Sequence, residues 1–162
     1  MESLINQLTN AIQECQNLKE EEGGIILRKE NEFSFVKITN NLSGLPIAQG
    51  LWEAERNEFA QKVLSKYKLG WRVYASLHTH PIFLPIPSAL DLSELFRGFP
   101  INFIYSKKDK KITEWSVHPV EGKNYERVDL DGVYLVNDDY TQITKTDVLP
   151  ELINSENKTH DE

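Results

Sequence analysis

Two histidines and an aspartate lie in the segment 75–91, whose sequence is ASLHTHPIFLPIPSALD. His78 and His80 end a run typical of a β-strand, where residues i and i+2 point to the same face of the sheet. Asp91 follows a proline-rich reversal that would bring the chain back toward the histidines. Two imidazoles and one carboxylate are a usual ligand set of catalytic zinc, which keeps a fourth position for water. The spacing therefore indicates a metal-dependent hydrolytic site.

A hydrolytic site also needs a general base and a hydrogen-bond donor for the oxyanion that forms during the reaction. The candidate bases are three consecutive glutamates, Glu20–Glu22, which precede Gly23 and Gly24 at the entry to the first expected strand. Ser88, three residues before Asp91, is the candidate donor.

Each of these features is also compatible with a purely structural role. A His-x-His pair can belong to an ordinary strand with polar residues. The sequence SALD, residues 88–91, is a good helix N-cap followed by an acidic residue in the first turn. The glutamate run can be a solvated charged surface.

The elements that must position these residues alternate between helix and strand. Apolar residues recur at helical spacing over 4–18 and 51–68, and Ser88 opens a short helix over 88–98. This order predicts an α/β fold, a mixed β-sheet flanked by helices, in a single domain over 1–153. Strands are expected over 24–30, 32–39, 71–80, 101–106, 112–120, 125–130 and 133–136, a short helix around 147–153, and a disordered C-terminal tail over 154–162.

Composition narrows the classes of partner and compartment. The chain has 162 residues and a formal net charge of −7, which disfavours nucleic acid as a partner. Its densest basic run, Ser106–Lys111, is interpreted as a solvated hairpin turn. The single cysteine, Cys15, fits a reducing compartment. Because the sequence shows neither a signal-peptide pattern nor a membrane-spanning run, we expect a cytoplasmic protein with no membrane partner.

Taken together, these motifs resemble a known family. HTHPIFLPIPSALD is similar to the JAMM signature of the JAB1/MPN/Mov34 zinc metalloproteases: H-[ST]-H-P, a short variable loop, then S-x-x-D. The family also carries an upstream glutamate in an E-x-x-G-[IL]-[IL] strand start, which EEGGII supplies at residues 21–26. This register selects Glu21 as the base, with Glu22 as the alternative. The Gly-Gly pair resembles the prokaryotic JAB-type branch.

The resemblance implies a cytidine-deaminase-like JAB/MPN fold and a zinc-dependent isopeptidase or peptidase, similar to a deubiquitinase. The substrate would be a ubiquitin-like or sulfur-carrier protein, cleaved after its C-terminus, with E1-like and E2-like proteins as further partners. His78, His80 and Asp91 would bind Zn²⁺. Glu21 would take a proton from water and return it to the leaving amine, and Ser88 would donate a hydrogen bond to the oxyanion.

Three alternatives compete with this hypothesis. Some members of the family keep the fold as a non-catalytic scaffold, but these lack one or more of the motif residues, all of which are present here. A peptidase acting on a peptide unrelated to ubiquitin would have the same site. A zinc deaminase shares the fold but needs a P-C-x-x-C motif, which one cysteine cannot supply.

Two segments are candidates for substrate recognition. Asn40–Trp52 and Pro81–Pro87 flank the expected site, and an extended C-terminal tail could add as a strand beside a sheet edge. Ile82, Phe83 and Leu84 are apolar in an expected loop, which suits either a docking surface or packing on the first helix.

Overall fold

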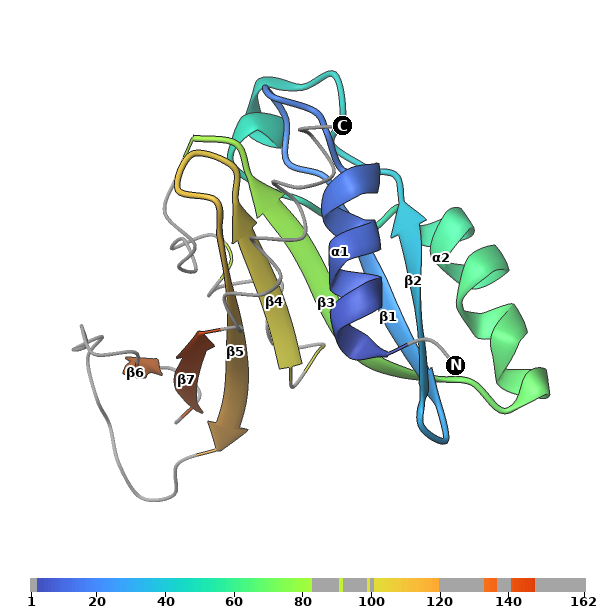
Figure 1. Ribbon diagram of the computed structural model, residues 1–162. Helices are drawn as coiled ribbons and strands as arrows, with labels where there is room; N and C mark the ends of the chain where they lie inside the picture. Colours follow the sequence, from blue (N-terminus) through green and yellow to red (C-terminus); the bar gives the residue numbers. More distant parts are fainter. Residues whose placement is uncertain are drawn as a thin grey trace, which may run out of the picture.

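The fold is an α/β sandwich built on one sheet, as a computed structural model shows (Figure 1). The structure describes residues 3–82, 91, 99, 101–119, 133–136 and 141–147. Its helices are α1 (Leu4–Glu14) and α2 (Arg56–Lys62), with the 3₁₀ turns η1 (Pro46–Gln49) and η2 (Leu64–Leu69). Its strands are β1 (Gly23–Lys29), β2 (Glu32–Ile38), β3 (Arg72–His80), β4 (Ile101–Ser106), β5 (Lys111–Pro119), β6 (Val133–Val136) and β7 (Thr141–Asp147).

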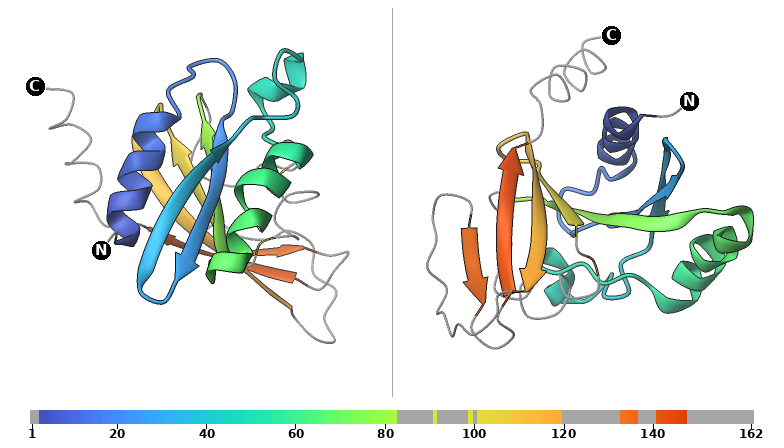
Figure 2. Two further views of the ribbon diagram at one scale, coloured as in Figure 1. Left: turned by 90° about the vertical axis from the view of Figure 1, so that its right-hand side faces the viewer. Right: turned by 90° about the horizontal axis from the view of Figure 1, so that it is seen from below.

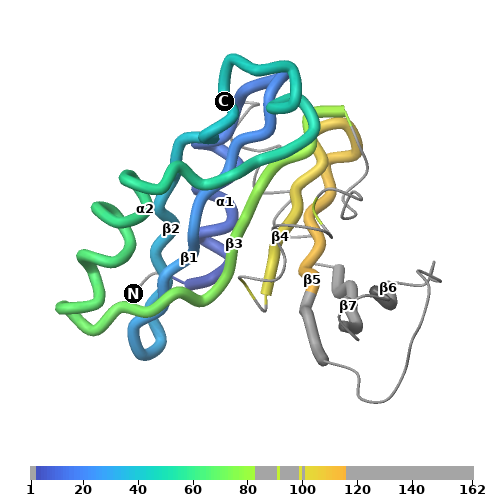
Figure 3. The backbone as a smooth tube through the Cα atoms, turned by 180° about the vertical axis from the view of Figure 1, so that it is seen from behind, coloured from blue at the N-terminus to red at the C-terminus, as the bar shows by residue number. Residues whose placement is uncertain are grey.

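The sheet is mixed, with strand order β2-β1-β3-β4-β5-β7-β6. Only β3 and β4 pair in parallel among these strands, so both end at the same edge. Because β1 is antiparallel to β3, β1 begins where β3 ends, and Gly23 lies opposite His78. The segments before β1 and after β2 both run over this end of the sheet (Figure 3). Residues distant in sequence therefore meet there.

The two helices cover opposite faces of the sheet (Figure 2). Leu8, Ala11 and Ile12 of α1 pack on one face against alternate strand residues such as Ile26 and Leu77. On the other face, a second core contains Ile25, Leu27, Ile38, Trp52 and Val63, against which Phe59 of α2 packs. Strand alternation thus separates one apolar layer from the other.

Side chains from both helices form hydrogen bonds with backbone groups along the outward edge of β2, which is an end strand of the sheet. The Phe35 N–H donates to Oε1 of Gln7 (2.7 Å), and the Thr39 N–H donates to Oε1 of Glu58 (3.1 Å). Between them, Lys62 Nζ donates to the carbonyl of Lys37 (3.2 Å). Both helices therefore supply partners to backbone groups that an edge strand would otherwise leave open.

The predicted α/β class and the mixed sheet flanked by helices are confirmed. The expected helix over 51–68 is too long, because Glu55 caps α2 by accepting hydrogen bonds from the N–H groups of Asn57 and Glu58. Leu51 and Trp52 precede this cap in non-helical chain and are buried there, so their apolar character reflects the core rather than a helix face.

The C-terminal strand β7 was not predicted. Its sequence, TQITKTD, contains a single aliphatic residue, so the hydrophobic alternation that identifies a strand is missing. The expected helices 88–98 and 147–153, strand 125–130 and tail 154–162 lie outside the described residues, except for Asp91 and for Asp147, which is the last residue of β7 and not the start of a helix. Among the helices that the structure describes, none is long and apolar enough to cross a membrane.

Candidate metal centre

His78 and His80 present their imidazoles to one point, at the end of β3. Both are buried, and their Nε2 atoms are 3.1 Å apart. The common direction follows from strand alternation, which sends the intervening Thr79 to the opposite face.

Asp91 completes a triangle of possible ligand atoms. Its Oδ2 lies 3.2 Å from Nε2 of His78 and 3.2 Å from Nε2 of His80. In a tetrahedral site with ligands at about 2.0–2.1 Å, neighbouring ligand atoms are about 3.3 Å apart. All three edges of the triangle are close to that length, so the three atoms are spaced to share one cation.

Glu21 faces the same point from the beginning of β1. Its Oε1 lies 3.8 Å from His78 Nε2, and its Oε2 lies 3.7 Å from His80 Nε2. Glu21 is 1% exposed, yet neither carboxylate oxygen has a hydrogen-bond partner among the described residues. A buried carboxylate in this position is costly unless a cation or a proton compensates it.

The two carboxyl groups have opposite pKa shifts. Burial and, after it, the negative charge of Asp91 raise the pKa of Glu21 to about 9. Burial alone would also raise the pKa of Asp91. The charges of His78 and His80, and hydrogen bonds with them, outweigh this effect and hold the pKa of Asp91 well below its usual range. Divergent carboxyl groups in one buried site are typical of acid–base centres.

The donor set fits a divalent metal. Ligand atoms of Glu21, His78, His80 and Asp91 all lie within 4.8 Å of one another, and all four residues are buried. Two imidazole nitrogens and carboxylate oxygens suit zinc, and a bound cation would offset the buried negative charge. The chain therefore has a possible metal-binding cluster, in which His78, His80 and Asp91 are the closest-spaced donors.

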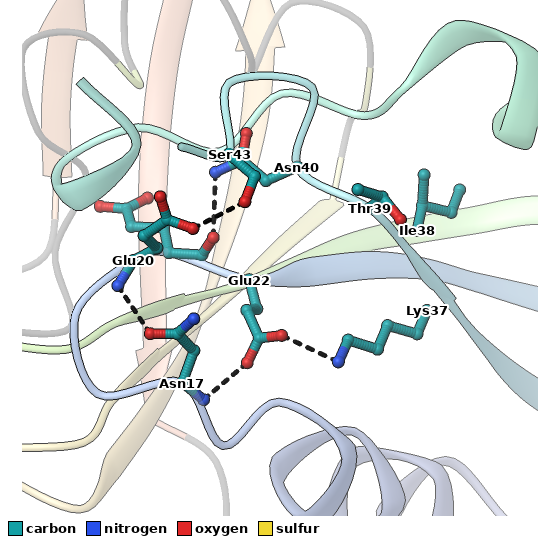
Figure 4. A pocket seen from close by; sticks show the side chains of 9 residues that line it. Asn17, Glu20, Glu22, Lys37, Ile38, Thr39, Asn40 and Ser43 are labelled. Carbon is teal, nitrogen blue, oxygen red and sulfur yellow. Dashed lines mark hydrogen bonds and ion pairs between the residues drawn. The ribbon is translucent and has the colours of Figure 1, made fainter. Parts of the chain in front are cut away.

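The neighbouring glutamates lie in different surroundings, shown in Figure 4. Glu20 accepts hydrogen bonds from Ser43 Oγ and Gly44 N–H, both at 2.8 Å. Glu22 pairs with Lys37 Nζ at 2.8 Å and accepts from the Asn17 N–H at 2.7 Å. Glu22, the alternative base, is thus engaged away from the histidines.

The strand register explains which glutamate faces the histidines. Extending the pairing of Gly23 with His78 by two residues places Glu21 opposite His80 and Glu22 opposite Thr79. Paired residues of an antiparallel ladder share a face, so Glu21 belongs with the histidines and Glu22 does not.

Loop 40–51 fixes the backbone of Glu21. The Glu21 N–H donates to the Ala48 carbonyl (2.8 Å), and the Glu21 carbonyl accepts from Asn40 Nδ2 (3.0 Å). Asn40 is buried and also donates to the Leu51 carbonyl, while its Oδ1 accepts from the N–H groups of Leu42 and Glu53. This segment therefore supports the site, a role that was not foreseen for Asn40.

Trp52 is a second residue that sequence reasoning missed. Its ring stacks on the imidazole of His78, with a distance of 6.3 Å between ring centroids and an interplanar angle of 5°. The Trp52 indole donates to the Ile38 carbonyl (3.3 Å), which ties the ring to β2. The interpretation of 51–68 as one helix concealed this contact.

A small polar cavity of about 140 Å³ adjoins the glutamates. Its lining includes Asn17, Lys37, Asn40 and Ser43 together with the glutamate run (Figure 4). The expected oxyanion donor, Ser88, lies outside the described residues, as do Phe83 and Leu84. Ile82 is described and is 62% exposed.

Comparison with known proteins gives the same fold. The chain matches the model of prokaryotic homologues of the JAB domain over residues 6–118. It is similar to the solution structure of protein DSY2949 from Desulfitobacterium hafniense, with 14% identity and a TM-score of 0.55. That similarity covers 90% of this chain and 86% of the other. No curated protein matches the chain. The family match spans all four residues of the buried cluster, and the chain belongs to the prokaryotic JAB-domain family.

Proposed function

We propose that the protein is a zinc-dependent peptidase or isopeptidase that hydrolyses the bond after the C-terminus of a ubiquitin-like protein. The observation that supports this most strongly is the buried cluster of Glu21, His78, His80 and Asp91 at the end of the sheet. Its carboxylates differ in pKa in the direction that separates a proton acceptor from a metal ligand.

Each residue has a defined task in this proposal. His78, His80 and Asp91 hold the cation, which when bound supplies a Lewis acid that acidifies water and polarises the scissile carbonyl. Glu21 accepts the proton of the attacking water and returns it to the leaving amine, which its position beside both Nε2 atoms supports. Ser88 is proposed as the oxyanion donor from the sequence motif.

The first experiment compares two adjacent glutamates. Glu21→Gln removes the base but keeps the side-chain volume, so we expect zinc content near wild type and a loss of turnover of roughly 10²–10⁴-fold. Glu20→Gln is the matched control, because Glu20 bonds to loop 40–51 instead of facing the histidines. Metal content by elemental analysis and kcat are measured for both variants. Wild-type turnover in Glu21→Gln would contradict the assignment of the base.

The second experiment addresses the substrate class. Purified protein is incubated with linear and lysine-linked fusions of a ubiquitin-like protein, with a sulfur-carrier protein fusion and with an unrelated peptide, each with and without a chelator. Cleavage after the modifier C-terminus that the chelator abolishes would support the proposal. Bound zinc without cleavage of any fusion would contradict the proposal and favour the alternative of a non-catalytic scaffold. A cytoplasmic location is part of the same proposal.

A further inference from the structure

Thr79 lies between the two histidines but faces away from them. It is fully buried, and its side chain and backbone both contact Glu22 on the neighbouring chain segment. Valine would pack equally well at such a position, so the hydroxyl group requires an explanation beyond packing.

The contact between Thr79 and Glu22 is an irregular end to the ladder of β1 and β3. The Thr79 N–H donates to the Glu22 carbonyl at 2.8 Å, as in a regular antiparallel pair. The return bond is different, because the Glu22 N–H donates to the Thr79 hydroxyl at 3.1 Å, where a regular pair would use the Thr79 carbonyl. The hydroxyl also lies 3.3 Å from the Glu22 carbonyl, to which it can donate.

The exchange of a backbone acceptor for a side-chain acceptor occurs just before β1 begins, one residue from Glu21. The Glu21 peptide leaves the ladder there and bonds instead to Ala48 and Asn40 of loop 40–51. The hydroxyl therefore marks the point at which the backbone departs from the sheet and carries the Glu21 carboxylate over the histidines.

We propose that Thr79 is a positioning residue, whose hydroxyl sets the placement of Glu21 relative to His78 and His80. The inference rests on the proposed function, since it assigns the base role to Glu21. It adds a physical connection between the two halves of the site: the same residue that spaces the histidines also holds the neighbour of the base.

The test compares variants that differ in the hydroxyl. Thr79→Val removes it with little change in volume, whereas Thr79→Ser keeps it. We expect Thr79→Val to lower kcat by roughly 10- to 100-fold, since a displacement of about 1 Å can have that effect. KM and zinc content should stay within about twofold of wild type, and Thr79→Ser should retain most of the activity. Thr113→Val is a matched control, because it removes the hydroxyl of another buried strand threonine, one that accepts from Trp115 Nε1.

Two readouts do not depend on turnover. Amide hydrogen exchange of Glu22 should accelerate in Thr79→Val and not in Thr79→Ser. In crystal structures of the zinc-loaded proteins, the Glu21 carboxylate should move away from the two Nε2 atoms in Thr79→Val only. If wild-type protein cleaves nothing, these readouts still decide the role of Thr79, so the two proposals fail separately.

Unchanged kcat in a folded Thr79→Val protein whose Glu22 amide exchanges faster would overturn the inference. If Thr79→Val does not fold, Thr79→Ala removes the hydroxyl without placing a methyl group against the Glu22 N–H. Full activity of Thr79→Ala would likewise contradict a positioning role.

Discussion

The two faces of β3 differ in how they bury their side chains. Toward α1, Ala75 and Leu77 enter an apolar core in which burial itself is favourable. On the opposite face, His78 and His80 are just as buried but meet two carboxylates. At the end of β3, one face contributes to folding through packing, whereas the other requires compensation of charge. The comparison shows that alternate residues of one strand can belong to an apolar core and to a possible metal-binding cluster.

Substitutions at adjacent positions of β3 should separate these two roles most strongly. Leu77→Ala is expected to lower the free energy of unfolding by about 2–5 kcal/mol, because it leaves a cavity in the core against α1. His78→Ala removes a proposed ligand and should lower zinc content well below one ion per chain. Chemical denaturation and elemental analysis measure the two effects. Undiminished zinc binding by His78→Ala would show that the cluster is not the metal site.

A comparison of alanine substitutions at Gly23 and at Gly44 tests the close approach of β1 to β3. A Cβ at Gly23 would lie 2.3 Å from the Leu77 carbonyl and 3.0 Å from His78 Cα, so Gly23→Ala must push the strands apart. We expect a loss of about 1–3 kcal/mol in stability, together with weaker metal binding. Gly44 has φ +90° but open space around it, so Gly44→Ala should cost only about 1 kcal/mol, from backbone strain. Equal effects of both variants on zinc affinity would contradict this distinction.

A further prediction concerns the pH dependence of stability in chelator-treated protein. The pKa of Glu21 rises from 4.5 to about 9 on folding, so its contribution favours the folded state below pH 4.5 and is lost as pH rises toward 9. The lowered pKa of Asp91 acts oppositely, with stability lost as the pH falls below its unfolded value of 3.8. Denaturation at pH 5 and pH 8 should therefore show lower stability at pH 8.

Glu21→Gln supplies the control for that measurement, because it removes the group whose pKa is raised. The decline in stability between pH 5 and pH 8 should be smaller in this variant and in zinc-loaded wild type. A decline of the same size in all three proteins would assign it to other residues.

Elements of the fold could be predicted best from the sequence where a regular hydrophobic period and a local motif agree. The hairpin of β1 and β2, the hairpin of β4 and β5, and the histidine strand follow from alternation and turn residues. The facing of His78 and His80 follows from the same period. Ser88 remains a prediction from the motif, as do the catalytic roles of the other residues.

What could not be predicted depends on tertiary contacts without a local pattern. Trp52 shows helical spacing with later apolar residues, but it lies before the Glu55 cap and stacks on His78. Asn40 is an ordinary loop residue in sequence, and its role arises only because loop 40–51 returns over Glu21. Strand β7 has threonines and charges where alternating aliphatic residues would have identified it.

The side-chain partners of β2 have a consequence for self-association. Phe35, Lys37 and Thr39 each offer a backbone group along the outward edge, and Gln7, Lys62 and Glu58 already engage these groups. A second copy that added its own strand along this stretch would have to displace these three hydrogen bonds. These hydrogen bonds therefore oppose fibril seeding and strand exchange at this edge. Under the proposed function, we expect an extended substrate tail to pair with another part of the sheet, nearer the cluster of Glu21, His78, His80 and Asp91.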